Sequence, residues 1–162
     1  MSQPYSLRPV QAEDEPLLFE IYASTRTEEM NLLAWDEPRK EAFLRMQFAA
    51  QHQHYRKAFA EGRFDIVLSG ERPIGRLYVA RGPDEIRIVD IALLPEGRNQ
   101  GIGSSLLKEI LAEAREAGKP VRIHVERNNP ALRLYERLGF SRIGDTGIYF
   151  VMEWVPEPPA PE

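Results

Sequence analysis

The sequence of 162 residues predicts a single domain of the α/β class, in which helices and strands are mixed along the chain. Short apolar runs bounded by turn residues indicate strands. Apolar residues spaced at i, i+3, i+4 and i+7 indicate amphipathic helices. The two patterns follow each other in the order strand–helix–helix–strand–strand–strand–helix–strand–helix–strand. The length suits one domain with a sizeable core.

The N-terminal half is predicted to be mainly helical after a short strand at residues 6–9. A first helix opens at residues 12–16 and continues through Tyr22 with apolar residues at helical spacing. Residues 35–38 interrupt the pattern. A second helix is predicted over residues 39–59, with one side formed by Phe43, Met46, Gln47, Ala50 and His54.

Three strands follow, at residues 64–68, 74–80 and 86–93. Each is a run of predominantly apolar residues. Turns rich in glycine and proline at residues 69–73 and 81–84 separate them, because these residues favour chain reversal. The third strand leads directly into the most informative segment of the chain.

That segment is a glycine-containing turn at residues 93–104, placed between the third strand and an amphipathic helix. Gly101 and Gly103 stand where the helix begins. The first turn of a helix has free backbone N–H groups and the positive end of the dipole, and glycines let an anion approach them. Arg98 could add a charged contact. The alternative is that the glycines only allow close packing of helix and sheet.

The turn does not fit two better known phosphate motifs. A dinucleotide-binding fingerprint would need a third glycine where Leu106 stands. The phosphate loop of nucleoside triphosphatases would end in Gly-Lys-Ser/Thr, which is absent. A phosphate or pyrophosphate held mainly by backbone amides is therefore the expected ligand of this turn.

A further strand and helix follow at residues 121–140. Residues 121–125 read as a strand, Asn129 as an N-cap and Pro130 as the first helical residue. Gly139 ends the helix and Phe140 packs behind it. One apolar stripe of this helix is formed by Ala131, Leu134, Tyr135 and Leu138.

Together the two segments resemble the GNAT superfamily of acyl-CoA-dependent N-acyltransferases. The resemblance covers residues 86–140. It rests on Arg98-x-x-Gly101-x-Gly103 after a strand, followed by Asn128-x-x-Ala131-x-x-x-Tyr135-x-x-x-Gly139-Phe140. Asn99 departs from the glycine that the family often has there. Asparagine tolerates a left-handed backbone, so we expect that conformation at Asn99.

The resemblance implies a mixed, mostly antiparallel central sheet with helices on both faces and splayed central strands. It also implies that the protein is an acyltransferase, and specifically an N-acetyltransferase that moves the acetyl group of acetyl-CoA to a primary amine. The chain has no cysteine, which excludes a cysteine acyl-enzyme. We therefore expect direct attack in a ternary complex. A non-catalytic acyl-CoA-binding module or a regulatory protein-binding domain is the alternative.

By the same resemblance, the pyrophosphate of acetyl-CoA lies on the glycine turn and the pantetheine arm pairs with the preceding strand. The backbone N–H of Leu93 would stabilise the oxyanion. The predicted acetyl-CoA site comprises Ile91, Leu93, Arg98, Asn99, Gln100, Gly101, Ile102, Gly103, Ser104 and Asn128.

Tyr135 matches the family's usual general acid, although its place on the apolar stripe also suits a core residue. Asp90 stands inside an apolar strand, where a carboxylate would be desolvated. It is a possible general base or, equally, a buried partner for an arginine. His124 is the rival base, and a water chain is a third alternative.

The acceptor pocket is expected in the helical N-terminal half, since the donor side is already assigned. The acceptor is a small-molecule or peptide amine. The predicted lining residues are Tyr22, Glu28, Glu29, Trp35, Gln51 and His54, and Arg26, Gln47 and Tyr55 are further candidates in the same half. None of them reveals the acceptor's identity.

Composition limits the class of protein. The net charge of −4 argues against a nucleic-acid partner, and 43% hydrophobic with 28% charged residues is ordinary for a globular domain. No apolar run approaches a membrane span, and the first residues lack signal-peptide features, so we expect a cytoplasmic protein without a membrane partner. His52 and His54 do not share a helix face, and no metal is expected.

The predicted domain boundary lies near the C-terminal end. Residues 1–154 are expected to form one acetyltransferase-like domain. Residues 155–162, Val-Pro-Glu-Pro-Pro-Ala-Pro-Glu, form a proline-rich tail that is expected to be disordered. A monomer or a homodimer is expected.

Overall fold

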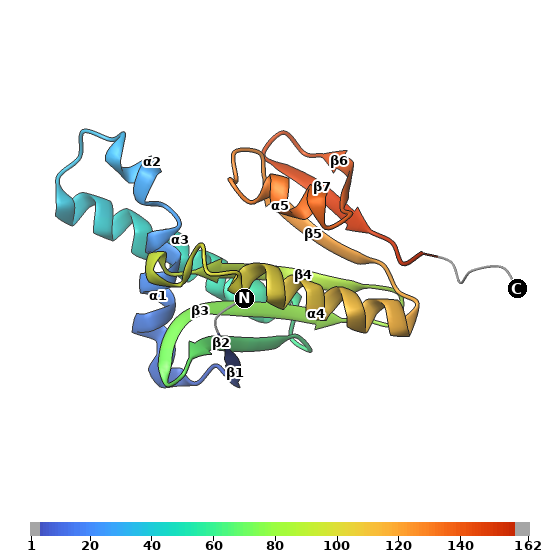
Figure 1. Ribbon diagram of the computed structural model, residues 1–162. Coiled ribbons are helices and arrows are strands. Elements are labelled where there is room, and N and C mark those ends of the chain that lie inside the picture. The colour runs from blue at the N-terminus through green and yellow to red at the C-terminus, as the bar shows by residue number, and fades with distance from the viewer. Residues whose placement is uncertain (1–3, 158–162) are drawn as a thin grey trace, which may run out of the picture.

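The computed structural model describes residues 4–157 and contains one seven-stranded sheet with helices on both faces (Figure 1). The strand order is β1-β2-β3-β4-β5-β7-β6, and every neighbouring pair is antiparallel except β4 and β5. The predicted mixed, mostly antiparallel fold is confirmed. The strands are β1 (Ser6–Pro9), β2 (Arg63–Ser69), β3 (Arg72–Arg81), β4 (Ile86–Leu93), β5 (Val121–Glu126), β6 (Ser141–Asp145) and β7 (Tyr149–Trp154).

The helices are α1 (Glu15–Ser24), α2 (Thr27–Asn31), α3 (Glu37–Ala58), α4 (Ile102–Ala117) and α5 (Leu132–Arg137), with single 3-10 turns at Ala12–Asp14 and Pro95–Gly97. The sequence did not predict α2. It also predicted one strand after α5, where the structure has the hairpin of β6 and β7.

Two helix starts differ from the sequence prediction. Glu37 and Pro38 were assigned to an interruption but are the first residues of α3, because the Asp36 side chain caps the helix by accepting from the Arg39 N–H at 2.9 Å. Proline is tolerated in a first helical turn. Helix α5 begins at Leu132, later than Pro130. Asn129 still acts as a local cap, since its Oδ1 accepts from the Ala131 N–H at 2.8 Å.

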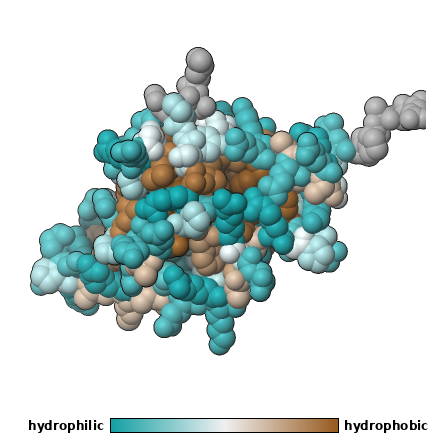
Figure 2. Space-filling view, turned by 90° about the horizontal axis from the view of Figure 1, so that it is seen from below, coloured by the Kyte–Doolittle hydropathy of each residue, from teal (hydrophilic) through white to brown (hydrophobic). Residues whose placement is uncertain are grey.

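The core lies on both faces of the sheet. On one face, the apolar stripe of α4, including Leu106 and Ile110, packs against Ile88 and Ile123. On the other face, α1 and α3 cover a second cluster around Tyr78. Seen from below, hydrophobic residues form a band across the middle of the molecule between hydrophilic surfaces (Figure 2). The layers hold the sheet's central strands in place.

Strands β4 and β5 separate along their length. They pair in parallel only where Ile86–Ile88 face Val121–Ile123, although both strands continue further. The register of β4 against β3 shifts between Tyr78 and Val79, so Val89 is an extra residue in β4. Such a bulge bends a strand and redirects its side chains. The result is a gap between the splayed halves of β4 and β5.

The predicted C-terminal tail is only partly described. Val155 to Glu157 have no regular structure, while residues 158–162 lie outside the described residues, as do residues 1–3. Within residues 4–157, no helix combines the length and the apolar character that crossing a bilayer would require.

Candidate active site

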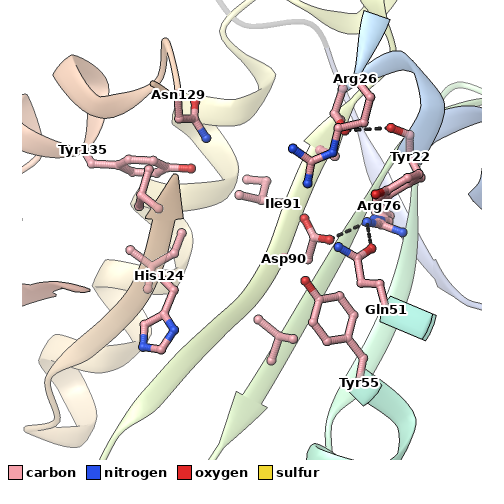
Figure 3. A pocket seen from close by; sticks show the side chains of 15 residues that line it. Tyr22, Arg26, Gln51, Tyr55, Arg76, Asp90, Ile91, His124, Asn129 and Tyr135 are labelled. Atoms are coloured by element: carbon pink, nitrogen blue, oxygen red, sulfur yellow. Dashed lines mark hydrogen bonds and ion pairs between the residues drawn. The ribbon is translucent and has the colours of Figure 1, made fainter. Parts of the chain in front are cut away.

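A cavity of about 130 Å³ occupies the gap between β4 and β5 (Figure 3). The β4 wall is formed by its last residues and the β5 wall by the three residues around His124. Helices α1 and α3 supply one flank and α5 the other. Its lining comprises Tyr22, Thr25, Arg26, Gln51, Tyr55, Arg76, Val89, Asp90, Ile91, Ala92, Ile123, His124, Val125, Asn129 and Tyr135.

The backbone of β4 is open toward this gap. The Leu94 N–H donates to the Ile74 carbonyl of β3 at 2.7 Å. Because backbone groups alternate in direction along a strand, those of Ile91 and Leu93 face away from β3. The Arg98 Nε donates to the Leu93 carbonyl at 2.9 Å. The edge of β4 can therefore pair with an extended ligand, as the sequence analysis expects of these two residues.

The glycine turn adjoins the open end of the gap. Gly101 is the N-cap of α4 with φ +79°, and Asn99 has φ +60°, the left-handed conformation expected for it. The first intrahelical bond runs from the Ser105 N–H to the Gly101 carbonyl at 3.0 Å. The N–H groups of Ile102, Gly103 and Ser104 thus have no partner within the helix.

The predicted alternative for Gly103 was close packing of helix and sheet. A Cβ at this position would meet only the side chain of Leu93, at 3.8 Å, which is ordinary contact. Packing within the protein therefore does not require glycine at 103. The turn itself is exposed at Arg98, Asn99 and Gln100, and the Gln100 side chain donates to the Glu96 carbonyl at 2.7 Å.

Tyr135 is buried in the core and also lines the cavity. Its ring is buried and meets the Phe140 ring edge to face, with centroids 5.8 Å apart. Its hydroxyl points into the cavity toward Ile91 (Figure 3). Burial and the nearby charge of Asp90 raise the pKa of the Tyr135 phenol. The phenol is therefore protonated throughout the neutral range.

Asp90 has the arginine partner that one of its two interpretations predicts. Its Oδ2 accepts from Nη2 of the buried Arg76, which also donates to Gln51 Oε1 at 2.8 Å. In Figure 3, the Tyr55 hydroxyl points toward the same carboxylate. Burial and the charge of Asp90 raise the pKa of Tyr55. Within the described residues, Asp90 Oδ1 accepts no hydrogen bond from a side chain, and Asp90 lines the cavity.

His124 lies on the β5 side of the cavity. Its ring is exposed and lies near that of Tyr149, with centroids 6.4 Å apart. Partial burial and the charge of Arg87 lower the pKa of His124. The imidazole is therefore mainly neutral at pH 7 and able to accept a proton. Both base candidates line one cavity.

The structure brings some predicted acceptor residues together and leaves others apart. Tyr22 and Gln51 line the cavity, as do the further candidates Arg26 and Tyr55. Glu28, Glu29 and His54 are exposed on their helices outside the lining. Trp35 packs edge to face on Phe43 at 5.3 Å and under Arg39 at 4.1 Å.

Asn128 is exposed in the loop after β5, and its neighbour Asn129 reaches the cavity instead. Sequence reasoning assigned Asn129 only a capping role. It also missed Arg76 altogether. The available signal for Arg76 was a charged residue inside the apolar run of β3, the same anomaly that singled out Asp90 in β4.

The described residues hold no group of three or more His, Asp or Glu side chains that could bind a metal ion. The titratable groups at the cavity include Asp90, His124 and two tyrosines with raised pKa values, Tyr55 and Tyr135, and the two arginines there, Arg26 and Arg76, are each paired with a carboxylate. This set suits proton transfer and the binding of a cationic group.

Comparisons with known proteins agree with this geometry. The sequence model of the acetyltransferase (GNAT) family matches residues 19–140. N-alpha-acetyltransferase RimI of Mycobacterium tuberculosis is 33% identical over 140 residues, which are 82% of this chain and 84% of that protein.

Two solved structures share the fold. PaiA N-acetyltransferase from Thermoplasma acidophilum in complex with coenzyme A superposes with a TM-score of 0.69 at 20% identity, covering 94% of this chain and 99% of the other. The ribosomal-protein-S18-alanine N-acetyltransferase of Escherichia coli superposes with a TM-score of 0.62 at 20% identity, covering 96% of each chain.

Proposed function

This chain belongs to the acetyltransferase (GNAT) family, and we propose that it transfers the acetyl group of acetyl-CoA to a primary amine by direct attack in a ternary complex. The observation that carries the proposal is the splayed gap between β4 and β5. An open strand edge and the phenol of Tyr135 line the cavity there, and the exposed glycine turn follows the same strand. Each of the three has a separate use in acyl transfer.

The donor would be held by the β4 edge and the start of α4. The free N–H groups of Ile102, Gly103 and Ser104 and the helix dipole suit the pyrophosphate. The backbone of Ile91 and Leu93 suits the extended pantetheine arm. Arg98, Asn99, Gln100 and Gly101 would complete the pyrophosphate site, and Asn128 would contact the arm from the β5 side.

The chemistry would use groups that already line the cavity. The Leu93 N–H would stabilise the negative charge that develops on the thioester oxygen. The Tyr135 phenol, kept protonated by its raised pKa, would donate its proton to the departing thiolate. A positioned proton donor of this kind assists the leaving group by stabilising the negative charge that develops on the sulfur.

The acceptor amine arrives as an ammonium at neutral pH and must lose a proton before it attacks. Asp90 Oδ1 offers the ammonium a negatively charged partner in a cavity that Tyr22 and Tyr55 also line. The charge of Asp90 is balanced by Arg76, so we assign Asp90 to orienting the ammonium. The neutral imidazole of His124 would then accept the proton, directly or through water.

For the acceptor we propose the α-amine of a polypeptide as the first class to test. A 33% identical relative that spans most of both chains is named an N-alpha-acetyltransferase. The cavity is small, about 130 Å³, so it suits an amine and its first side chain rather than a whole peptide. The rest of a polypeptide would lie outside.

The experiment is a thiol-release assay with acetyl-CoA and a panel of amines. The panel contains peptides with a free α-amine, the same peptides with a blocked α-amine and a free lysine, and small amines. We expect thiol release that depends on the free α-amine and an acetylated peptide detected by mass spectrometry. Tight acetyl-CoA binding with no acetylated product from any amine would support a non-catalytic acyl-CoA-binding module instead.

A further inference from the structure

Arg26 and Glu126 form an ion pair across the acceptor side of the cavity. The Arg26 Nη1 donates to Glu126 Oε2 at 2.9 Å, and Nη2 lies 2.7 Å from Oε1. Both oxygens and both terminal nitrogens are thus used in one planar contact, which is the strongest arrangement for this pair of groups. The two side chains retain only 18% and 30% exposure.

The two residues belong to parts of the structure that are joined by no other ion pair within residues 4–157. Arg26 is the N-cap of α2, and Glu126 is the last residue of β5, at the splayed end of the gap. Across residues 4–157, no other ion pair joins helices α1 to α3 to strands β5 to β7. The sheet cannot make this connection itself, since β4 and β5 have stopped pairing well before Glu126.

Further contacts fix Arg26 in this position. Its guanidinium lies over the Tyr22 ring at 5.4 Å and contacts Glu29 at 3.2 Å. Burial alone would lower the pKa of Arg26, but the hydrogen bonds and charge of Glu126 outweigh it and raise the pKa, so the guanidinium stays charged. In Figure 3, Arg26 comes from the helical flank and its guanidinium points into the cavity.

From this geometry we propose that the Arg26–Glu126 pair is a clasp that sets the distance between the helical wall and the β5 wall of the cavity. The helical wall is formed by α1 and α3 and carries Tyr22, Gln51 and Tyr55. The β5 wall is formed by β5 and α5 and carries His124 and Tyr135. Arg26 and Glu126 are positioning residues, which place the amine without reacting with it.

The clasp matters because acyl transfer is sensitive to the separation of the reacting groups. Displacement of about 1 Å can cost about a hundredfold in rate. Opening the clasp would change acceptor positioning most directly. The helix amides at the start of α4 and the pairing of β4 with β3 do not depend on it, and the contact of Arg98 with Ser24 at 3.4 Å is the link from the donor site to this region. Acceptor kinetics should therefore respond to the clasp much more strongly than acetyl-CoA affinity.

The main test uses Glu126→Gln, which keeps the shape of the side chain and leaves Arg26 on the Tyr22 ring. We expect kcat/KM for the acceptor to fall about tenfold, a usual size for coupled neighbours, with a change in the Kd for acetyl-CoA of less than about twofold. Glu41→Gln is the matched control, because it removes a carboxylate from an exposed ion pair with Arg45 within α3 and should change neither value. A Glu126→Gln enzyme within twofold of wild type for the acceptor overturns the clasp.

The reversed pair, Arg26→Glu combined with Glu126→Arg, separates a clasp from direct recognition of the acceptor. A clasp predicts that the reversed pair recovers acceptor kcat/KM to within about threefold of wild type. A folded double variant that stays as impaired as Glu126→Gln would mean that Arg26 or Glu126 contacts the acceptor directly. The clasp hypothesis would then be wrong.

The kinetic half of this inference rests on the proposed acetyl transfer, and the structural half does not. Hydrogen exchange on the free protein tests the structural half. Glu126→Gln should speed exchange at residues 25–31 and at residues 124–127 together, and Glu41→Gln should not. Unchanged exchange in both segments overturns the clasp even if no amine is acetylated. A wild-type protein that acetylates no amine, with the exchange change present, overturns the proposed function alone.

Discussion

Asp90 of β4 and Arg76 of β3 form an ion pair beneath the cavity, with Arg76 almost completely buried and the Asp90 side chain 17% exposed. Gln51 of α3 accepts a second hydrogen bond from the same Arg76 nitrogen. The pair joins the sheet to the helix that flanks the acceptor side. A carboxylate presented to an incoming ammonium is thereby held in one orientation.

We predict that Arg76→Met destabilises the protein by about 3 kcal/mol, because removal of one partner leaves a desolvated, unpaired charge. Urea unfolding followed by circular dichroism measures the change. The double variant Arg76→Met with Asp90→Leu should be less destabilised than the sum of the two single variants. Strict additivity of the three unfolding free energies would show that the pair does not couple the two strands.

Gly103→Val tests the acetyl-CoA site. The fold accepts a Cβ at this position, where only Leu93 lies within reach at 3.8 Å, so the melting temperature should change little. The larger side chain would stand between the ligand's pyrophosphate and the helix amides. We expect acetyl-CoA affinity, measured by calorimetry, to fall about tenfold or more. The affinity of Gly103→Ala should lie between those of wild type and Gly103→Val. A folded Gly103→Val protein with wild-type affinity would place the pyrophosphate elsewhere.

Local patterns account for the parts of the fold that could be predicted. The bounds of β4 agree with the prediction because its apolar run ends at a clear turn. Helix α2, with five residues, is too short for a periodic pattern to identify. The start of α3 was misplaced because Pro38 was taken as a break, although Asp36 provides a cap that proline in the first turn does not disturb.

The site could be predicted only where its parts lie close together in the sequence. The glycine turn and Tyr135 belong to short motifs of fixed spacing. The pairs Arg76–Asp90 and Arg26–Glu126 join residues that are 14 and 100 positions apart. Strand register and the splay of β4 from β5 determine which charged residues pair. Neither can be predicted from the local periodicity of the sequence. Asn129 lines the cavity, which the sequence did not indicate, because the shape of a loop decides which side chain turns inward.

The two residues assigned to the amine should have different kinetic signatures. Asp90→Asn should mainly raise KM for the acceptor, about tenfold, because it removes the ammonium's charged partner. His124→Gln should mainly lower kcat/KM above the pKa of His124, where the neutral imidazole can act as the base. The pKa of His124 is lowered below its usual value near 6.5, and a base works unprotonated, so the acidic limb should lie below pH 6.5 in wild type.

That acidic limb distinguishes His124 from its rival. It should disappear in His124→Gln and remain in Asp90→Asn. The reverse pattern, with the limb lost only in Asp90→Asn, would make Asp90 the base and leave His124 as a surface residue. The measurement is the profile of kcat/KM between pH 5 and pH 9. Loss of a general base usually lowers the rate by about 10²–10⁴-fold.

A chain without cysteine has no thiol to carry the acetyl group, so initial-rate plots at varied acetyl-CoA and varied amine should intersect rather than run parallel. Mass spectrometry of the enzyme mixed with acetyl-CoA alone should show no acetylated species that goes on to react with amine. A kinetically competent acetyl-enzyme would require another nucleophile and would rule out direct transfer.

Tyr135→Phe separates the two roles of one side chain. The substitution removes the hydroxyl that points into the cavity and keeps the ring that packs on Phe140. The fold should therefore survive, with a small change in melting temperature. If the phenol protonates the thiolate, kcat should fall by about 10²–10⁴-fold, with acetyl-CoA affinity little changed. Its pKa is raised by burial and by Asp90, so wild type should lose this proton donor only in strongly alkaline solution.

The rate-limiting step has to be established for this result to count. A slower chemical step lowers kcat only if chemistry, and not product release, limits turnover. A pre-steady-state burst of thiol would show that product release is limiting. Phe140→Leu is the matched control, because it disturbs the packing of the Tyr135 ring and leaves the hydroxyl in place. It should cost stability and little turnover. If Tyr135→Phe keeps turnover within about twofold of wild type while chemistry limits the rate, Tyr135 is a core residue whose hydroxyl has no part in the reaction.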